Sequence, residues 1–135
     1  FKEIDNMEFI EKHKLLIAII ILIILVIFVA GQNKTPSIIN ATNPESVSEL
    51  VSDDEVVIID VREEEEYNEG HIPQARNIPY TQIKNKVDYD LDTKIAVYCQ
   101  TGARSHLAAV QLNQMGYKYV YDMGGIDNYT GKLSK

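Results

Sequence analysis

The sequence predicts an α/β fold, with a central, mainly parallel β-sheet flanked by helices and preceded by one transmembrane helix. An uninterrupted apolar run near the N-terminus, residues 15–30, predicts the membrane-spanning segment. Beyond residue 37, short strand-like runs alternate with helical patterns, which favours a parallel sheet with helical connections. One of these runs, residues 56–59, is apolar and β-branched throughout, as expected of a strand covered on both faces.

The apolar run divides the chain into four predicted parts. We expect an N-terminal tail at residues 1–14, a transmembrane helix at residues 15–31, a linker at residues 32–36 and one folded domain at residues 37–135. As a helix, the apolar run would cover about 24 Å, slightly less than the hydrocarbon core of a typical bilayer. Because it is apolar on every face, a buried helix of a soluble domain is the weaker interpretation.

A cleaved signal peptide is the remaining alternative for the apolar run, because the lengths of the two kinds of segment overlap. Phe28 argues against cleavage after Ala30, since a small residue is needed at that position. Lys12 and Lys14 precede the run, and Lys34 follows it. The positive-inside tendency therefore predicts a single-pass cell-membrane protein with a cytoplasmic N-terminus and an extracytoplasmic domain.

Capping residues and apolar periodicity predict the elements of the domain in order. Asn43 and Pro44 are typical of the start of a helix, and Gly116 is typical of the end of one. The predicted strands are residues 38–39, 56–59, 95–98 and 119–121; the predicted helices begin at residue 44, cover residues 63–68, 81–86 and 105–115, and include a closing helix after residue 125. In the helix at 105–115, the side chains available for burial are Leu107, Val110, Leu112 and Met115.

The composition excludes several classes of site. The chain of 135 residues has one cysteine and three histidines without metal-ligand spacing, so we expect neither a disulfide nor a metal site. The net charge of −7 lies entirely in residues 44–135, and no basic stripe is present, so nucleic acid is not an expected partner. Since no glycine-rich phosphate loop of the Walker or dinucleotide type occurs either, no cofactor is expected.

Cys99 stands where a predicted strand meets a predicted helix, which is the most informative position in the chain. Four residues separate it from Arg104, and a loop of that length can curl its backbone N–H groups around one point. The helix that follows adds unpaired N–H groups and the positive end of its dipole. This setting should favour the thiolate and hold an anion over the sulfur. A buried structural cysteine is the alternative, because free cysteine is often fully buried.

Four motifs stand in a characteristic order along the domain. They are Asp-Val-Arg at 60–62, Gly-His-Ile-Pro-Gln-Ala-Arg-Asn-Ile-Pro at 70–79, Cys-Gln-Thr-Gly-Ala-Arg-Ser at 99–105 and Met-Gly-Gly-Ile at 123–126. In this order and spacing they resemble the rhodanese family, the single-domain sulfurtransferases. The resemblance covers residues 37–135 and implies a rhodanese-like fold.

The resemblance implies a sulfurtransferase that moves a sulfane sulfur from a donor such as thiosulfate to a thiophilic acceptor. Cys99 would be the catalytic nucleophile and would carry the sulfur as a persulfide. Asp60 and Arg62 would support the loop as a charged pair. The partners would be a small sulfur-containing anion, a thiol acceptor or a protein sulfur donor or acceptor, with the bilayer bound through residues 15–31. The implied anion-binding residues are Gln100, Thr101, Gly102, Ala103, Arg104 and Ser105.

Other interpretations of the same residues remain open. Cysteine-dependent phosphatases place five residues between cysteine and arginine, and the shorter loop here favours sulfur over a phosphoryl group. A membrane-tethered persulfide carrier and a non-catalytic rhodanese-like binding module are the alternative functions. We expect His71 to fix a loop and the acidic run at 63–66 to form a solvated helix face, with repulsion of anionic donors as its alternative role.

Overall fold

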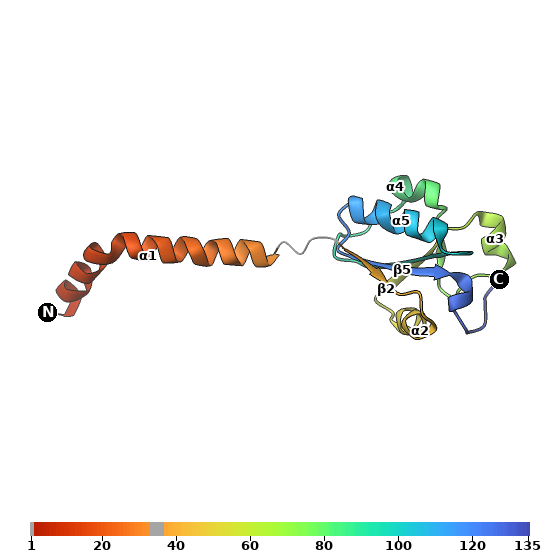
Figure 1. Cartoon of the computed structure of the whole chain (residues 1–135), viewed down its shortest axis with the longest axis horizontal. Helices are drawn as coiled ribbons and strands as arrows, with labels where there is room; N and C mark the ends of the chain where they lie inside the picture. The colour runs from red at the N-terminus through yellow and green to blue at the C-terminus, as the bar shows by residue number, and fades with distance from the viewer. Residues whose placement is uncertain (1, 33–36) are drawn as a thin grey trace. The chain divides into compact units, whose positions relative to one another are not determined.

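The computed structural model describes residues 2–32 and 37–135 (Figure 1). The chain separates into two compact units, Phe1–Lys34 and Thr35–Lys135. The predicted linker at residues 32–36 lies, apart from its first residue, outside the described residues.

The N-terminal unit consists of helix α1, Lys2–Gln32, which includes both the predicted tail and the predicted span. Within the described residues, Asp5–Gly31 is the stretch long and apolar enough to cross a membrane, with 27 residues. That length corresponds to about 40 Å of helix, which exceeds the hydrocarbon thickness. None of the described side chains in the most apolar part of this stretch is buried, so packing among the described residues does not account for its apolar character. Length and composition make α1 a candidate membrane anchor.

Residues 37–135 form an α/β domain around a five-stranded sheet in the order β1-β5-β4-β2-β3, and all pairings between these strands are parallel. The predicted mainly parallel sheet is confirmed. The strands are β1 (Ser37–Asn40), β2 (Val56–Asp60), β3 (Arg76–Asn77), β4 (Lys94–Cys99) and β5 (Tyr119–Gly125). The helices are α2 (Pro44–Ser52), α3 (Glu64–Glu69), α4 (Ile83–Lys86) and α5 (Ala103–Gln114), with short 3₁₀ turns at Tyr80–Gln82 and Ile126–Asn128.

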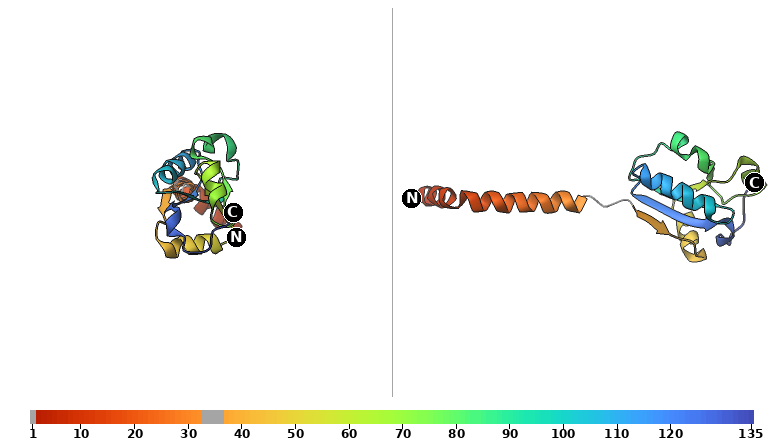
Figure 2. Two further views of the ribbon diagram at one scale, coloured as in Figure 1. Left: turned by 90° about the vertical axis from the view of Figure 1, so that its right-hand side faces the viewer. Right: turned by 45° about the horizontal axis from the view of Figure 1, so that its top comes forward.

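Helices cover both faces of the sheet, with α4 and α5 on one side and α2 on the other (Figures 1 and 2). A hydrophobic cluster of buried side chains lies on each face of the sheet. Strand β4 contributes to both clusters because its side chains alternate between the two faces. Ile95, Val97 and Cys99 face the cluster that includes α5, whereas Ala96 and Tyr98 face the cluster that includes α2. All five of these side chains are buried, which explains the continuous apolar run in the sequence.

Several elements differ from the sequence-based expectations. Helix α5 begins at Ala103, two residues earlier than predicted, and the expected closing helix is the 3₁₀ turn Ile126–Asn128. Leu107, expected to be buried, is 50% exposed, while the small residues Ala108 and Ala109 face the sheet. Small side chains let the helix approach the strands closely, a reason that apolar periodicity alone does not reveal. Strand β3 was not predicted because it has only two residues.

We predict that Leu112→Ala destabilises the domain by about 2–5 kcal/mol, because the fully buried side chain leaves a cavity between α5 and the sheet. Urea unfolding of the full chain in detergent micelles measures this through tyrosine fluorescence, since all 8 tyrosines lie between positions 67 and 129. Leu107→Ala, on the exposed side of the same helix, is the control and should change stability by less than about 0.5 kcal/mol. Equal effects of the two substitutions would contradict the assigned helix face.

Candidate active site

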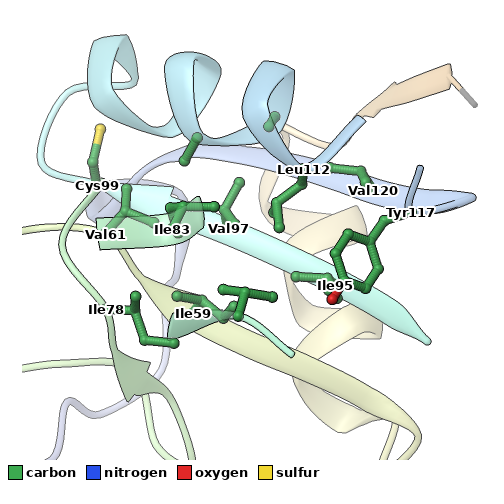
Figure 3. Close-up of a cluster of buried hydrophobic side chains, with 13 residues drawn as sticks. Ile59, Val61, Ile78, Ile83, Ile95, Val97, Cys99, Leu112, Tyr117 and Val120 are labelled. Atoms are coloured by element: carbon green, nitrogen blue, oxygen red, sulfur yellow. The ribbon is translucent and has the colours of Figure 1, made fainter. Parts of the chain in front are cut away.

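Cys99 is the last residue of β4 and lies beneath the loop that leads into α5. Figure 3 shows its sulfur at the edge of the buried cluster, pointing toward that loop. The residue is 1% exposed, yet the backbone N–H of Gly102 donates a hydrogen bond to Sγ over 3.0 Å. The sulfur is therefore covered by the loop itself and contacts one of its amides.

Helix α5 begins directly after the loop, and its first turn carries further N–H groups. The N–H of His106 donates to the carbonyl of Gly102 over 3.2 Å. The N–H groups of Ala103, Arg104 and Ser105 precede this bond, in the turn where an α-helix offers no intrahelical acceptor. Gly102 has φ +107°, a left-handed conformation that favours glycine. The turn at Gly102 thus brings the N–H of this residue to the sulfur and places it at the positive end of the helix dipole.

The end of β5 supports the loop from the other side. Cys99 pairs with Gly125 in the parallel register of β4 and β5, where the ladder shifts locally. A Cβ atom on Gly125 would lie 2.7 Å from the carbonyl oxygen of Gln100 and 3.3 Å from Cα of Thr101. The backbone of the loop therefore rests directly on this glycine. The sequence singled out the Gly-Gly pair as a motif but not its role as the support of the loop.

Ser105 was expected to bind an anion, and the structure assigns its hydroxyl a different contact. The side chain is fully buried, with Oγ 2.9 Å from the carbonyl of Gly102 and 2.7 Å from Oδ1 of Asp122. The same carboxylate oxygen accepts the N–H of Gly124 over 3.0 Å. Asp122 thus ties the first turn of α5 to the end of β5. Asp122 was not predicted, although an aspartate directly after the predicted strand at 119–121 was a signal for it.

Asp60 and Arg62 form the expected charged pair, buried at the end of β2. Arg62 donates to the carboxylate of Asp60 through Nε and Nη2, over 2.7–3.1 Å. Its Nη1 donates to Oε1 of Gln100 over 3.1 Å, and its Nη2 also donates to the carbonyl of Gly70 over 2.7 Å. The pair therefore connects β2 and the end of α3 to the loop, as expected of a brace.

Arg104 is not a free cation in this structure. Its Nη1 and Nη2 donate to the two carboxylate oxygens of Glu66 over 2.7 and 2.9 Å, a bidentate pair between α5 and α3. These hydrogen bonds lower the pKa of Glu66 to about 2 and raise the pKa of Arg104. Glu66 also accepts the backbone N–H of Glu63 and so caps α3. The expectation of a wholly solvated acidic face was therefore wrong for this residue.

The remaining predicted residues fall into two groups. The side chains of Gln100, Thr101 and Ala103 are exposed, so the outer side of the loop faces solvent. His71 stacks on Tyr67 with ring centroids 3.7 Å apart, and its Nδ1 lies 2.9 Å from the carbonyl of Tyr67. These contacts hold the histidine in place beside α3, in agreement with a loop-fixing role.

Comparison with known proteins identifies the class. Residues 43–132 match the rhodanese-like domain family, and the chain belongs to that family. Among solved structures, a rhodanese with anions from E. coli is 32% identical, with a TM-score of 0.57. The match covers 59% of this chain and 98% of the E. coli chain. A rhodanese-like domain protein from Staphylococcus aureus is 26% identical, with a TM-score of 0.60. That match covers 73% of this chain and 96% of the S. aureus chain.

Three similar proteins of Bacillus subtilis illustrate the range of relatives. The uncharacterized protein YqhL of Bacillus subtilis is 41% identical over 78 residues, which are 56% of this chain and 62% of YqhL. The putative sulfurtransferase YtwF of Bacillus subtilis is 37% identical over 84 residues, which are 62% of this chain and 82% of YtwF. The putative sulfur carrier protein YrkF of Bacillus subtilis is 35% identical over 83 residues, which are 60% of this chain and 45% of YrkF. This chain thus spans less than two thirds of YqhL and of YrkF.

We predict that Gly125→Ala destabilises the domain by about 1–3 kcal/mol, because the new methyl group would displace the backbone of the loop at Gln100. Gly125 has φ −82°, so backbone conformation does not oppose alanine and the effect is steric. Urea unfolding followed by tyrosine fluorescence measures the change. Gly31→Ala is the control, since nothing lies within 4 Å of a Cβ there. A Gly125→Ala protein as stable as this control would contradict the close approach.

Proposed function

We propose that the protein is a sulfurtransferase that carries sulfane sulfur on Cys99. The position of Sγ beneath a loop amide and the first turn of a helix is the observation that carries this proposal. The thiolate attacks the outer sulfur of a donor such as thiosulfate, the S–S bond of the donor breaks, and sulfite leaves with the bonding electrons. A thiophilic acceptor then takes the sulfur from the Cys99 persulfide and regenerates the thiolate.

The loop residues have separate roles in this reaction. Backbone N–H groups of residues 100–105 stabilise the thiolate and the terminal sulfur of the persulfide, because preorganised amides need no rearrangement as charge moves. Arg104 retains N–H groups beyond the two that bind Glu66, and these orient the donor. Asp60 and Arg62 keep the loop in place through Gln100. The chemistry requires no metal or organic cofactor.

A persulfide carrier is the second candidate function, favoured by the similarity to the putative sulfur carrier YrkF. In this role the same Cys99 persulfide passes to one protein partner. Turnover with small donors would then be slow, whereas exchange with the thiol of that partner would be fast. The ratio of these two rates distinguishes a carrier from an enzyme that acts on small molecules.

We predict that thiosulfate adds one sulfur atom to the full chain and that Cys99→Ser abolishes the gain, because Cys99 is the sole cysteine. Intact-mass spectrometry of the protein in detergent micelles measures the gain, and cyanide should remove it. Absence of any gain in the parent protein, with thiosulfate and with sulfane-sulfur donors of lower charge, would favour a binding module over an enzyme or carrier. A gain that persists in Cys99→Ser would exclude the cysteine as the carrier of the sulfur.

The same proposal includes a membrane anchor formed by α1. The length of the apolar stretch and the absence of buried side chains on it, within the described part of α1, support this role. An extracytoplasmic domain would expose the lone thiol to oxidising conditions, and persulfide formation would protect it from oxidation to the sulfonic acid.

We predict that a C-terminal epitope tag is accessible to antibody in right-side-out membrane vesicles and inaccessible in inverted ones, because positive charge concentrates before the span. A tag at the N-terminus is the control and should show the opposite pattern. Reversal of both patterns would place the domain in the cytoplasm. A mature chain that lacks the N-terminal tag would instead identify the segment as a cleaved signal.

A further inference from the structure

The positive charge closest to the loop, on Arg104, is balanced by a carboxylate. Glu66 accepts hydrogen bonds from both terminal nitrogens of Arg104, and the two side chains are only about one third exposed, at 32% and 27%. A bidentate pair of this kind fixes the geometry of the guanidinium and cancels most of its long-range field. Arg104 can therefore orient a ligand by hydrogen bonding but adds little net attraction for an anion.

The second arginine of the site is neutralised in the same way. Arg62 binds both oxygens of Asp60, and the side chains are 5% and 0% exposed. Its remaining donors reach Gln100 and the carbonyl of Gly70 rather than the space above the sulfur. Neither arginine that contacts the loop thus supplies an uncompensated charge.

The neighbouring surface adds negative charge. A cavity of about 460 Å³ lies against α3 and has Glu63, Glu64 and Glu65 in its lining, with Lys86 as its basic residue. These carboxylates occupy the same segment as Glu66. Together with the net charge of −7, they oppose the approach of a multiply charged anion.

We infer that the site selects sulfane-sulfur donors of low negative charge over the thiosulfate dianion, and that Glu66 is a specificity-determining residue. The inference rests on the proposed sulfur transfer through Cys99. The preferred class comprises zwitterionic thiosulfonates and uncharged or zwitterionic persulfides, whose outer sulfur is held by the loop amides without a large charge penalty.

Three thiosulfonate-type donors test this, because the same bond breaks in each. Thiosulfate carries two negative charges, methanethiosulfonate carries one, and 2-aminoethanethiosulfonate is a zwitterion of zero net charge. In every case the thiolate of Cys99 attacks the outer sulfur, the S–S bond breaks, and sulfite or a sulfinate leaves with the electron pair. The number of electrons and the total charge balance without an added oxidant or reductant.

The experiment compares the loading rate of Glu66→Gln with that of the parent chain for each donor, with both proteins in nonionic detergent. Dividing the two rates removes the intrinsic reactivity of the donor. We expect an increase of about tenfold for thiosulfate, about threefold for methanethiosulfonate and little for the zwitterion, because the lost repulsion scales with donor charge. Glutamine still accepts a hydrogen bond from Arg104, and Glu69→Gln at the exposed end of α3 removes the same charge as a control.

A salt series on the parent chain provides a second readout that needs no variant. Screening of a repulsion should raise the loading rate with thiosulfate as ionic strength increases, and should leave the rate with the zwitterion nearly unchanged. A thiosulfate rate that falls with salt would overturn the inference. So would equal rate ratios for all three donors in Glu66→Gln, which would indicate a purely structural role for Glu66. Absence of loading by every donor in the parent would instead refute the proposed sulfur transfer.

Discussion

The burial of β4 on both faces is the constraint on which the rest of the domain depends. Its side chains alternate between two cores, so the strand cannot slip by one residue without exchanging them. The parallel pairing with β2 and β5 then fixes where β4 ends. Because that end is Cys99, the packing of the core determines the position of the sulfur before any residue of the loop contributes.

The residues around the sulfur come from the carboxyl ends of adjacent parallel strands, where sites of α/β proteins usually form. Asp60 ends β2 and holds Arg62, and Asp122 and Gly125 lie near the end of β5. Each neighbouring strand thus supports the loop by a different contact, one through a buried ion pair and the other through a carboxylate and a close backbone approach. The loop is held from both sides of β4.

Local signals made the fold and the loop predictable from sequence. Apolar β-branched runs gave the central strands, and the spacing between Cys99 and Arg104 pointed to the loop. Contacts between distant residues were not predictable in this way. Arg104 and Glu66 are 38 positions apart, and Ser105 and Asp122 are 17 apart, so no periodicity or capping pattern links them. Only the parallel crossover connections bring these partners to one edge of the sheet.

The pairing of both arginines with carboxylates changes what the loop can recognise. A free cation attracts any anion over several ångströms, whereas backbone amides act mainly at hydrogen-bond distance. With Arg62 and Arg104 compensated, binding in the proposed sulfur transfer would depend on how well the outer atom of the donor fits beside the loop amide that contacts Sγ. Such a site would discriminate between donors by the size and local charge of one atom. Carboxylates that neutralise the arginines of an anion site would thereby make it selective for sulfur.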